Sequence, residues 1–171
     1  MSASTNQATI ERFYAAFAAL DSDTMQACYA AQATFEDPAF SLRGREQIGG
    51  MWRMLCSAVR AKGMDAWKLE TSAISANASS GRAHWQPHYR FSATGRMVHN
   101  IVDAEFTFKD GLIVNHVDRF DFYRWSRQAL GPVGVLLGWT PILRNKVRRQ
   151  AQVNLTAFLA KSAATVSACR N

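Results

Sequence analysis

The sequence has few of the features that would place it among membrane, disulfide-rich or metal-binding proteins. It contains no run of about 18 apolar residues, the length that a membrane-spanning helix requires. Its start, MSASTNQATIERFY, lacks a basic stretch followed by an apolar one, so we expect no signal peptide. These absences predict a cytoplasmic protein.

Cysteine is also scarce, with 3 in 171 residues. Cys28, Cys56 and Cys169 are odd in number and far apart, and no CxxC or Cys/His spacing exists. We therefore expect reduced, mostly buried thiols and no disulfide framework. His84 and His88 do not form a metal pair, because side chains four residues apart on a strand are separated by ~13 Å. We expect no metal and no cofactor.

Acidic residues are almost missing from the C-terminal segment. Residues 119–171 hold 9 of the 20 basic residues but only one acid, Asp121, and the whole chain has a net charge of +7. Such a segment is typical of a solvated helical face, or of contact with an acidic partner, anionic lipid or nucleic acid. No nucleic-acid motif is present, so we expect no nucleic-acid partner. We rank contact with a membrane surface below the solvated face.

The first third of the chain has helical periodicity. ATIERFYAAFAAL, DSDTMQACYA and REQIGGMWRMLCSAVRAKG each place apolar residues at helical spacing and predict three helices. Between the second and third, ATFEDPAFSLRG is predicted to be a loop, because Pro38 stops a helix and Gly44 favours a turn.

After Gly63 the period changes to two. AWKLETSAISA, RAHWQPHYRF, MVHNIVDAEFTF and LIVNHVDRFDFY are predicted strands, and short turns between them indicate antiparallel hairpins. DFYRWSRQALG is expected to turn helical with Asp121 as a cap, GPVGVLLGWTP to be an apolar loop, and ILRNKVRRQAQVNLTAFLA to be a basic amphipathic helix. Helices followed by strands predict an α+β domain over residues 1–125, with residues 126–171 packing on it.

The turn in FKDGLI allows two registers for the last two strands. A two-residue type I′ turn pairs Lys109 with Leu112 and mixes charged and aromatic groups on both faces. A three-residue loop with a bulge at Gly111 pairs Phe108 with Leu112 instead, and separates a mainly apolar face from a polar one. Since each large buried apolar side chain contributes about 1.5–3 kcal/mol, we predict the bulged register.

In this register His116 and Asp118 point inward, two residues apart on one strand. The same inner face is predicted to hold Phe106, Phe108, Leu112, Val114 and Phe120, with Trp85, Tyr89, Phe91, Asn100 and Val102 from the neighbouring strands. Burial disfavours a charged carboxylate, so we expect the pKa of Asp118 to be raised, which suits a general acid or base. The alternative is a buried pair with a purely structural role.

The motifs ATFEDP and DGLIVNHVDRFD, after N-terminal helices, resemble the nuclear-transport-factor-2-like superfamily. The resemblance covers about residues 5–125 and is nearest to the SnoaL-like and ketosteroid-isomerase-like group. It implies a cone: a curved antiparallel sheet with N-terminal helices packed on its concave face around a deep apolar pocket, here followed by a C-terminal amphipathic helix. Many members are homodimers, and we expect one here.

The resemblance also implies roles for individual residues. The general base of the isomerases matches Asp37, although an aspartate before proline also caps a turn. Their two oxyanion donors fall on Phe13 and Ala104, so we do not expect a steroid isomerase. An aspartate of related epoxide hydrolases matches Asp118, and the aspartate and histidines of the polyketide cyclases are compatible with His116 and Asp118.

We therefore predict Asp118, His116 and Asp37 as catalytic residues. The predicted substrate-binding residues are Trp85, Tyr89, Asn100, Tyr14, Phe17, Trp52, Phe106 and Phe120. The predicted function is a small-molecule pocket protein, acting as a cofactor-free isomerase, cyclase or epoxide hydrolase on an apolar substrate. Two alternatives stay open: a non-catalytic protein that binds an apolar ligand, and a dimeric interaction module.

Overall fold

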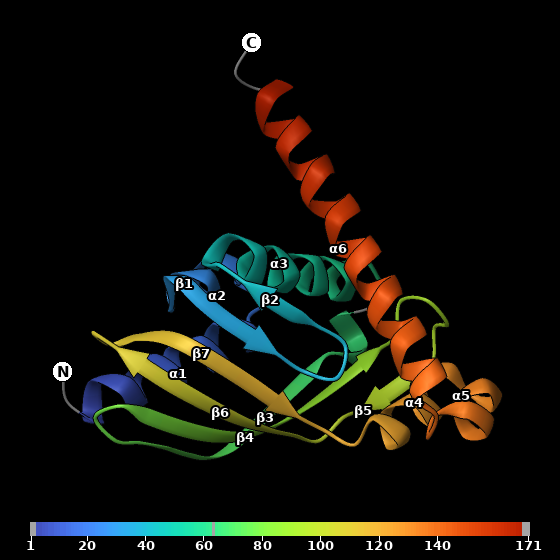
Figure 1. The fold of residues 1–171 in the computed structure, drawn as a ribbon, viewed down its shortest axis with the longest axis horizontal. Helices are drawn as coiled ribbons and strands as arrows, with labels where there is room; N and C mark the ends of the chain where they lie inside the picture. The colour runs from blue at the N-terminus through green and yellow to red at the C-terminus, as the bar shows by residue number, and fades with distance from the viewer. Residues whose placement is uncertain (1–2, 63, 169–171) are drawn as a thin grey trace.

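A curved, unclosed sheet of seven strands forms the centre of the computed structural model, which describes residues 3–62 and 64–168 (Figure 1). The strand order is β2-β1-β7-β6-β4-β3, and β5 pairs with β4 outside this path. The strands are β1 (Tyr29–Glu36), β2 (Ser41–Arg43), β3 (Lys68–Ala76), β4 (Ser80–Arg90), β5 (Met97–His99), β6 (Val102–Lys109) and β7 (Leu112–Arg119).

The helices lie before, between and after the strands in the sequence. They are α1 (Ala3–Ala18), α2 (Ser22–Ala27), α3 (Arg45–Lys62), α4 (Phe122–Leu130), α5 (Pro132–Leu137) and α6 (Pro141–Ala168), with one 3-10 turn, η1 (Met64–Ala66). α1 packs against β3 and β4, and α3 packs against β1 and β2. The apolar stripe of α1 is buried as its spacing predicts, and the α+β class is confirmed.

The segment from Tyr29 to Arg43 differs from its prediction. Instead of a helix end followed by a loop, it forms β1 and β2. α2 ends at Ala27, and β1 then pairs with β2 on one side and, in parallel, with β7 on the other. Pairing on both edges outweighs the helix preference of the alanine-rich stretch YAAQATFE. The sheet is therefore antiparallel except between β1 and β7.

The turn of the β6–β7 hairpin differs from the predicted one, but His116 and Asp118 still point to the predicted inner face. Lys109 pairs with Leu112 across a two-residue turn in which Asp110 and Gly111 have φ of 53° and 76°, as a type I′ turn requires. The three-residue loop with a bulge at Gly111 is therefore wrong.

The extra residue is taken up further along, at Val114, because Phe108 pairs with Ile113 whereas Thr107 pairs with Asn115. As a consequence Ile113 points inward and is buried, whereas its neighbours Leu112 and Val114 were the residues predicted to point inward. Beyond the bulge the alternation agrees with the prediction: Phe106 lies opposite His116 and Ala104 opposite Asp118.

The C-terminal segment is more helical than expected. Asp121 caps α4 as predicted, its side chain accepting the N–H of Arg124 at 3.0 Å, but the expected apolar loop contains the short helix α5. α6 extends beyond its predicted end and packs on α3, then rises away from the sheet (Figure 1). Leu155 is buried in this contact, whereas Val153 is exposed. No helix within the described residues is long and apolar enough to cross a membrane.

Cys28 and Cys56 are buried and unpaired, as expected. Cys169 lies outside the described residues.

Candidate functional site

The site is centred on the inner face of β7. His116 is fully buried, and Asp118 follows it on the same face with 3% of its surface exposed. Five aromatic rings surround the imidazole, with that of Phe106 at 4.3 Å between centroids and that of Phe35 at 5.0 Å. His116 has no exposed surface and Asp118 almost none, so the pair is enclosed by the protein.

A chain of hydrogen bonds runs through the imidazole. The Trp52 indole N–H donates to the Tyr29 hydroxyl at 3.1 Å, and this hydroxyl lies 2.7 Å from Nδ1 of His116. On the other side, Nε2 of His116 lies 3.0 Å from Oδ1 of Asp118, which also accepts the Trp85 indole N–H at 3.3 Å.

One placement of the protons satisfies every hydrogen bond of this chain. An indole nitrogen can only donate, so the Tyr29 oxygen accepts from Trp52 and is free to donate its own proton to Nδ1 of His116. His116 then carries its proton on Nε2 and donates it to Asp118. Burial raises the pKa of Tyr29 well above its usual value, which keeps the phenol protonated.

The hydroxyl of Tyr14 has no hydrogen-bond partner although it is buried. Burial raises its pKa well above the usual value, and the nearby charge of Asp118 raises it further. A buried polar group without a partner is costly, so this free donor marks a place where a ligand oxygen could bind.

Asp37 follows the end of β1 and is predicted both as a catalytic residue and as the cap of a turn. Its Oδ1 accepts the backbone N–H groups of Ala39 at 2.6 Å and Phe40 at 2.5 Å, so it does cap a turn. Burial raises its pKa to about 7; the Phe40 N–H opposes this rise, and the charge of Asp118 adds to it. This carboxyl therefore keeps its proton to a higher pH than an ordinary aspartate does.

Tyr89 lies near the end of β4 and packs against the second aromatic cluster, around Trp125. Burial raises the pKa of Tyr89 to about 12, the hydrogen bond from Trp125 lowers it, and the charge of Asp37 raises it. The Trp125 indole donates to the Tyr89 oxygen at 2.9 Å. Asn100 lies just beyond β5 and is buried, as expected.

The remaining predicted residues form the wall around this network. Phe17, Trp52, Trp85 and Phe106 pack in the main aromatic cluster, while Phe120 is partly buried between that cluster and a second one around Trp125. The aromatic side chains fill the space next to His116. A cavity of about 230 Å³ opens between α1 and β3, lined by Glu11, Tyr14, Ala15, Ala18, Leu69, Thr71 and Ile74.

Sequence reasoning missed two members of the network. Tyr29 was assigned to a helix, and it reaches His116 only because it begins a strand that pairs with β7. Trp125 lies on α4, and its contact with Tyr89 depends on how that helix folds back onto the sheet. The alternating pattern of YAAQATFE, with Tyr29, Ala33 and Phe35 buried, was the signal available for β1.

The other histidines lie outside this network, on the opposite face of the sheet. His84 pairs with Asp103 at 2.8 Å, and the ring of His88 stacks on that of His99 with centroids 4.0 Å apart. Among the described residues, no group of three or more histidine, cysteine or acidic side chains could hold a metal ion.

Comparison with known proteins identifies the family. Residues 10–116 match the family model of the SnoaL-like domain, so the chain belongs to that family, within the nuclear-transport-factor-2-like superfamily that its motifs resemble. No curated protein sequence matches it. α4, α5 and α6 lie beyond the matched residues.

Several solved structures share the fold. An LEH-like epoxide hydrolase of M. tuberculosis is 20% identical, with 79% of this chain and 96% of that chain covered and a TM-score of 0.59. Bal32a, from a soil-derived mobile gene cassette, is 20% identical over 74% and 97%, with a TM-score of 0.61. A candidate polyketide cyclase from Xanthomonas campestris pv. campestris is 18% identical over 74% and 98%, with a TM-score of 0.59. At these identities the likeness shows the fold alone.

Proposed function

We propose that this protein is an enzyme that performs cofactor-free acid–base chemistry on a small apolar molecule, as an isomerase, cyclase or epoxide hydrolase. The observation that carries the proposal is the carboxylate of Asp118, which is held by two N–H donors in an aromatic interior beside the unpartnered hydroxyl of Tyr14. The epoxide hydrolase and the candidate polyketide cyclase among the similar structures support this class of chemistry by analogy.

The residues divide into two roles. Asp118 is the general base, because it alone of the buried pair keeps exposed surface. His116 is a positioning residue: it fixes the orientation of the carboxylate and is itself fixed by Tyr29. Tyr14, Tyr89 and Asn100 anchor polar atoms of the substrate.

Asp37 is the complementary acid. With a pKa of about 7 it carries a proton in conditions where an ordinary aspartate would have lost it. In one turnover Asp118 takes a proton from a carbon or a water molecule, and Asp37 gives one to the substrate oxygen. The substrate gains and loses one proton, and exchange with solvent then removes the proton from Asp118 and returns one to Asp37, which restores the starting state.

A substrate panel with one matched pair of variants tests the proposal. Small apolar epoxides and conjugated or cyclisable ketones would be incubated with the protein and with Asp118→Asn and Asp103→Asn. We expect Asp118→Asn to lower turnover by about 10²–10⁴-fold while ligand affinity stays within a few-fold. Asp103→Asn, an aspartate on the outer face, serves as the control and should keep full activity.

The alternatives give different results. If the protein binds apolar ligands and turns over no member of the panel, it is a non-catalytic binding protein. The expected homodimer is a separate prediction, which light scattering after size-exclusion chromatography would test.

A further inference from the structure

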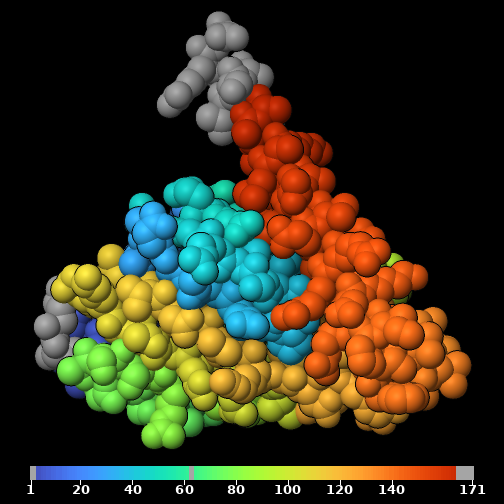
Figure 2. Space-filling view, in the orientation of Figure 1, coloured from blue at the N-terminus to red at the C-terminus, as the bar shows by residue number. Residues whose placement is uncertain are grey.

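One end of the molecule carries an exposed apolar surface, which we call the α5 patch. Its six residues lie within ten positions: Val133 (51% exposed), Val135 (50%), Leu136 (70%), Leu137 (48%), Trp139 (71%) and Ile142 (79%). Figure 2 shows this end (orange) as a bulge beside the sheet. Leaving each such side chain in water forgoes about 1.5–3 kcal/mol of burial, so a patch of six calls for an explanation.

The way α5 packs explains why these side chains face outward. Gly134 and Gly138 lie so close to Ser126 on α4 that a Cβ at either position would overlap it. The helix therefore presents its glycines to the protein and its large apolar side chains to the outside, the reverse of an ordinary surface helix. The packing keeps the patch open instead of burying it.

The segments before and after α5 in the sequence are basic. After Asp121 the sequence contains no acidic residue, while Arg124, Arg127, Arg144 and Lys146 flank α5. Arg127 lies 5.1 Å above the ring of Tyr123, which holds its guanidinium at this end of the molecule.

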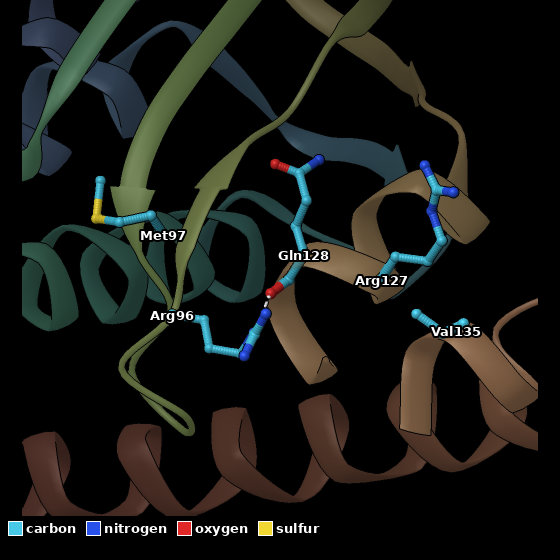
Figure 3. A pocket seen from close by; sticks show the side chains of 5 residues that line it. All are labelled: Arg96, Met97, Arg127, Gln128 and Val135. Atoms are coloured by element: carbon cyan, nitrogen blue, oxygen red, sulfur yellow. Dashed lines mark hydrogen bonds between the residues drawn. The ribbon is translucent and has the colours of Figure 1, made fainter. Parts of the chain in front are cut away.

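A cavity adjoins the patch and adds a second basic feature. It has a volume of about 580 Å³ and is lined by Arg96, Met97, Arg127, Gln128 and Val135, the last of which belongs to the patch (Figure 3). Arg96 is fixed there, because its Nε donates to the Gln128 carbonyl at 2.8 Å. Arg96 and Arg127 both line this hollow and give it positive charge, which attracts an anionic group such as a phosphate.

We propose that this end of the molecule docks on the surface of an anionic lipid bilayer. The α5 patch inserts among the outer parts of the lipid chains, Trp139 sits at the level of the headgroups, and Arg96 and Arg127 face lipid phosphates. α5 has 6 residues, which is too few to span a bilayer, so it lies on the bilayer surface in this proposal. A second copy of the chain fits the patch less well, because joining two such ends would bring two acid-free basic segments together.

Vesicle co-sedimentation of the whole protein tests this proposal independently of any catalysis. The probes are vesicles of phosphatidylcholine alone and of phosphatidylcholine with phosphatidylglycerol. We expect binding to the anionic vesicles that weakens as salt is added. Trp139→Asp should weaken it about tenfold or more, and Arg127→Gln several-fold.

Two exposed positions elsewhere provide matched controls. Val153→Asp replaces an exposed apolar side chain on α6, and Lys109→Gln removes a charge at the far β6–β7 hairpin. Both should bind like the unchanged protein. Failure to bind anionic vesicles would overturn the proposal, as would equal losses in the control variants. Self-association that Trp139→Asp abolishes, without vesicle binding, would assign the patch to a second copy.

Discussion

Nε2 of His116 lies 3.0 Å from Oδ1 of Asp118, two positions further along the same strand. The pair faces inward because the bulge at Val114 changes the alternation of β7 before it reaches His116. Without the bulge, the polar face of the hairpin would point into the aromatic interior. The candidate site thus depends on one extra residue in one strand.

Removing the hydroxyl of Tyr29 should destabilise the protein. Tyr29→Phe leaves the Trp52 N–H and Nδ1 of His116 without their partner in a buried place. We expect the free energy of unfolding to fall by about 1–3 kcal/mol in urea denaturation. Tyr123→Phe is the control: its hydroxyl bonds to the Val135 carbonyl at an exposed position, and its loss should cost under about 0.5 kcal/mol. Equal effects of the two variants would refute the network.

Two substitutions of Asp118 should differ in stability. Asparagine keeps an oxygen that accepts from His116 and Trp85, so Asp118→Asn should change the free energy of unfolding by less than about 1 kcal/mol. Asp118→Ala leaves both donors unpartnered and should cost about 2–4 kcal/mol. Thermal and urea unfolding measure both. Similar stabilities for the two variants would show that the donors do not depend on this carboxylate.

The raised pKa of Asp37 predicts a pH-dependent stability. Below pH 3.8 both the folded and the unfolded chain hold this proton, and between pH 3.8 and about 7 only the folded chain does. The free energy of unfolding therefore falls as pH rises through that window, and the contribution of Asp37 is constant above it. The fall is on the order of 2 kcal/mol after allowance for the partial exposure of Asp37.

Asp37→Asn should remove this dependence, because the amide oxygen still caps the turn and no charge can form. Urea midpoints between pH 4 and 8 measure it, with Asp103→Asn as the control that keeps the slope. A variant whose stability falls with pH as steeply as that of the unchanged protein would assign the dependence to another group.

The type I′ turn of the hairpin can be tested at its two central residues. Gly111→Ala introduces a Cβ at a φ of 76° and should cost about 1 kcal/mol. Asp110→Asn should be neutral or slightly stabilising, since Asn-Gly is the preferred pair for this turn. A Gly111→Ala variant as stable as the unchanged protein would contradict the turn geometry.

Much of the architecture could be predicted from periodicity. The stripe of α1, the change to alternation after Gly63 and the cap at Asp121 are local patterns, and each has its expected structure. The inward direction of His116 and Asp118 followed from the burial of several phenylalanines, which does not depend on where the bulge lies.

The features that the sequence did not predict share one physical origin: they depend on contacts between distant segments. β1 forms because β2 and β7 pair with it, and α5 faces outward because its glycines fit against Ser126. The contact of α5 with Ser126 has no signal within its own segment, and the only local signal for β1 is the weak alternation of YAAQATFE. The same holds for the bond from Trp125 to Tyr89, which joins residues from two elements that no local pattern relates.

The most direct test of the account is the position of the proton on His116. Long-range nitrogen–hydrogen correlation NMR on the ¹⁵N-labelled protein distinguishes the two ring nitrogens. We predict a proton on Nε2, directed at Asp118, and an unprotonated Nδ1 that accepts from Tyr29. The Nε2 signal should shift in Asp118→Asn and stay unchanged in Asp103→Asn. A proton on Nδ1, or a signal averaged between the two nitrogens by contact with water, would contradict it.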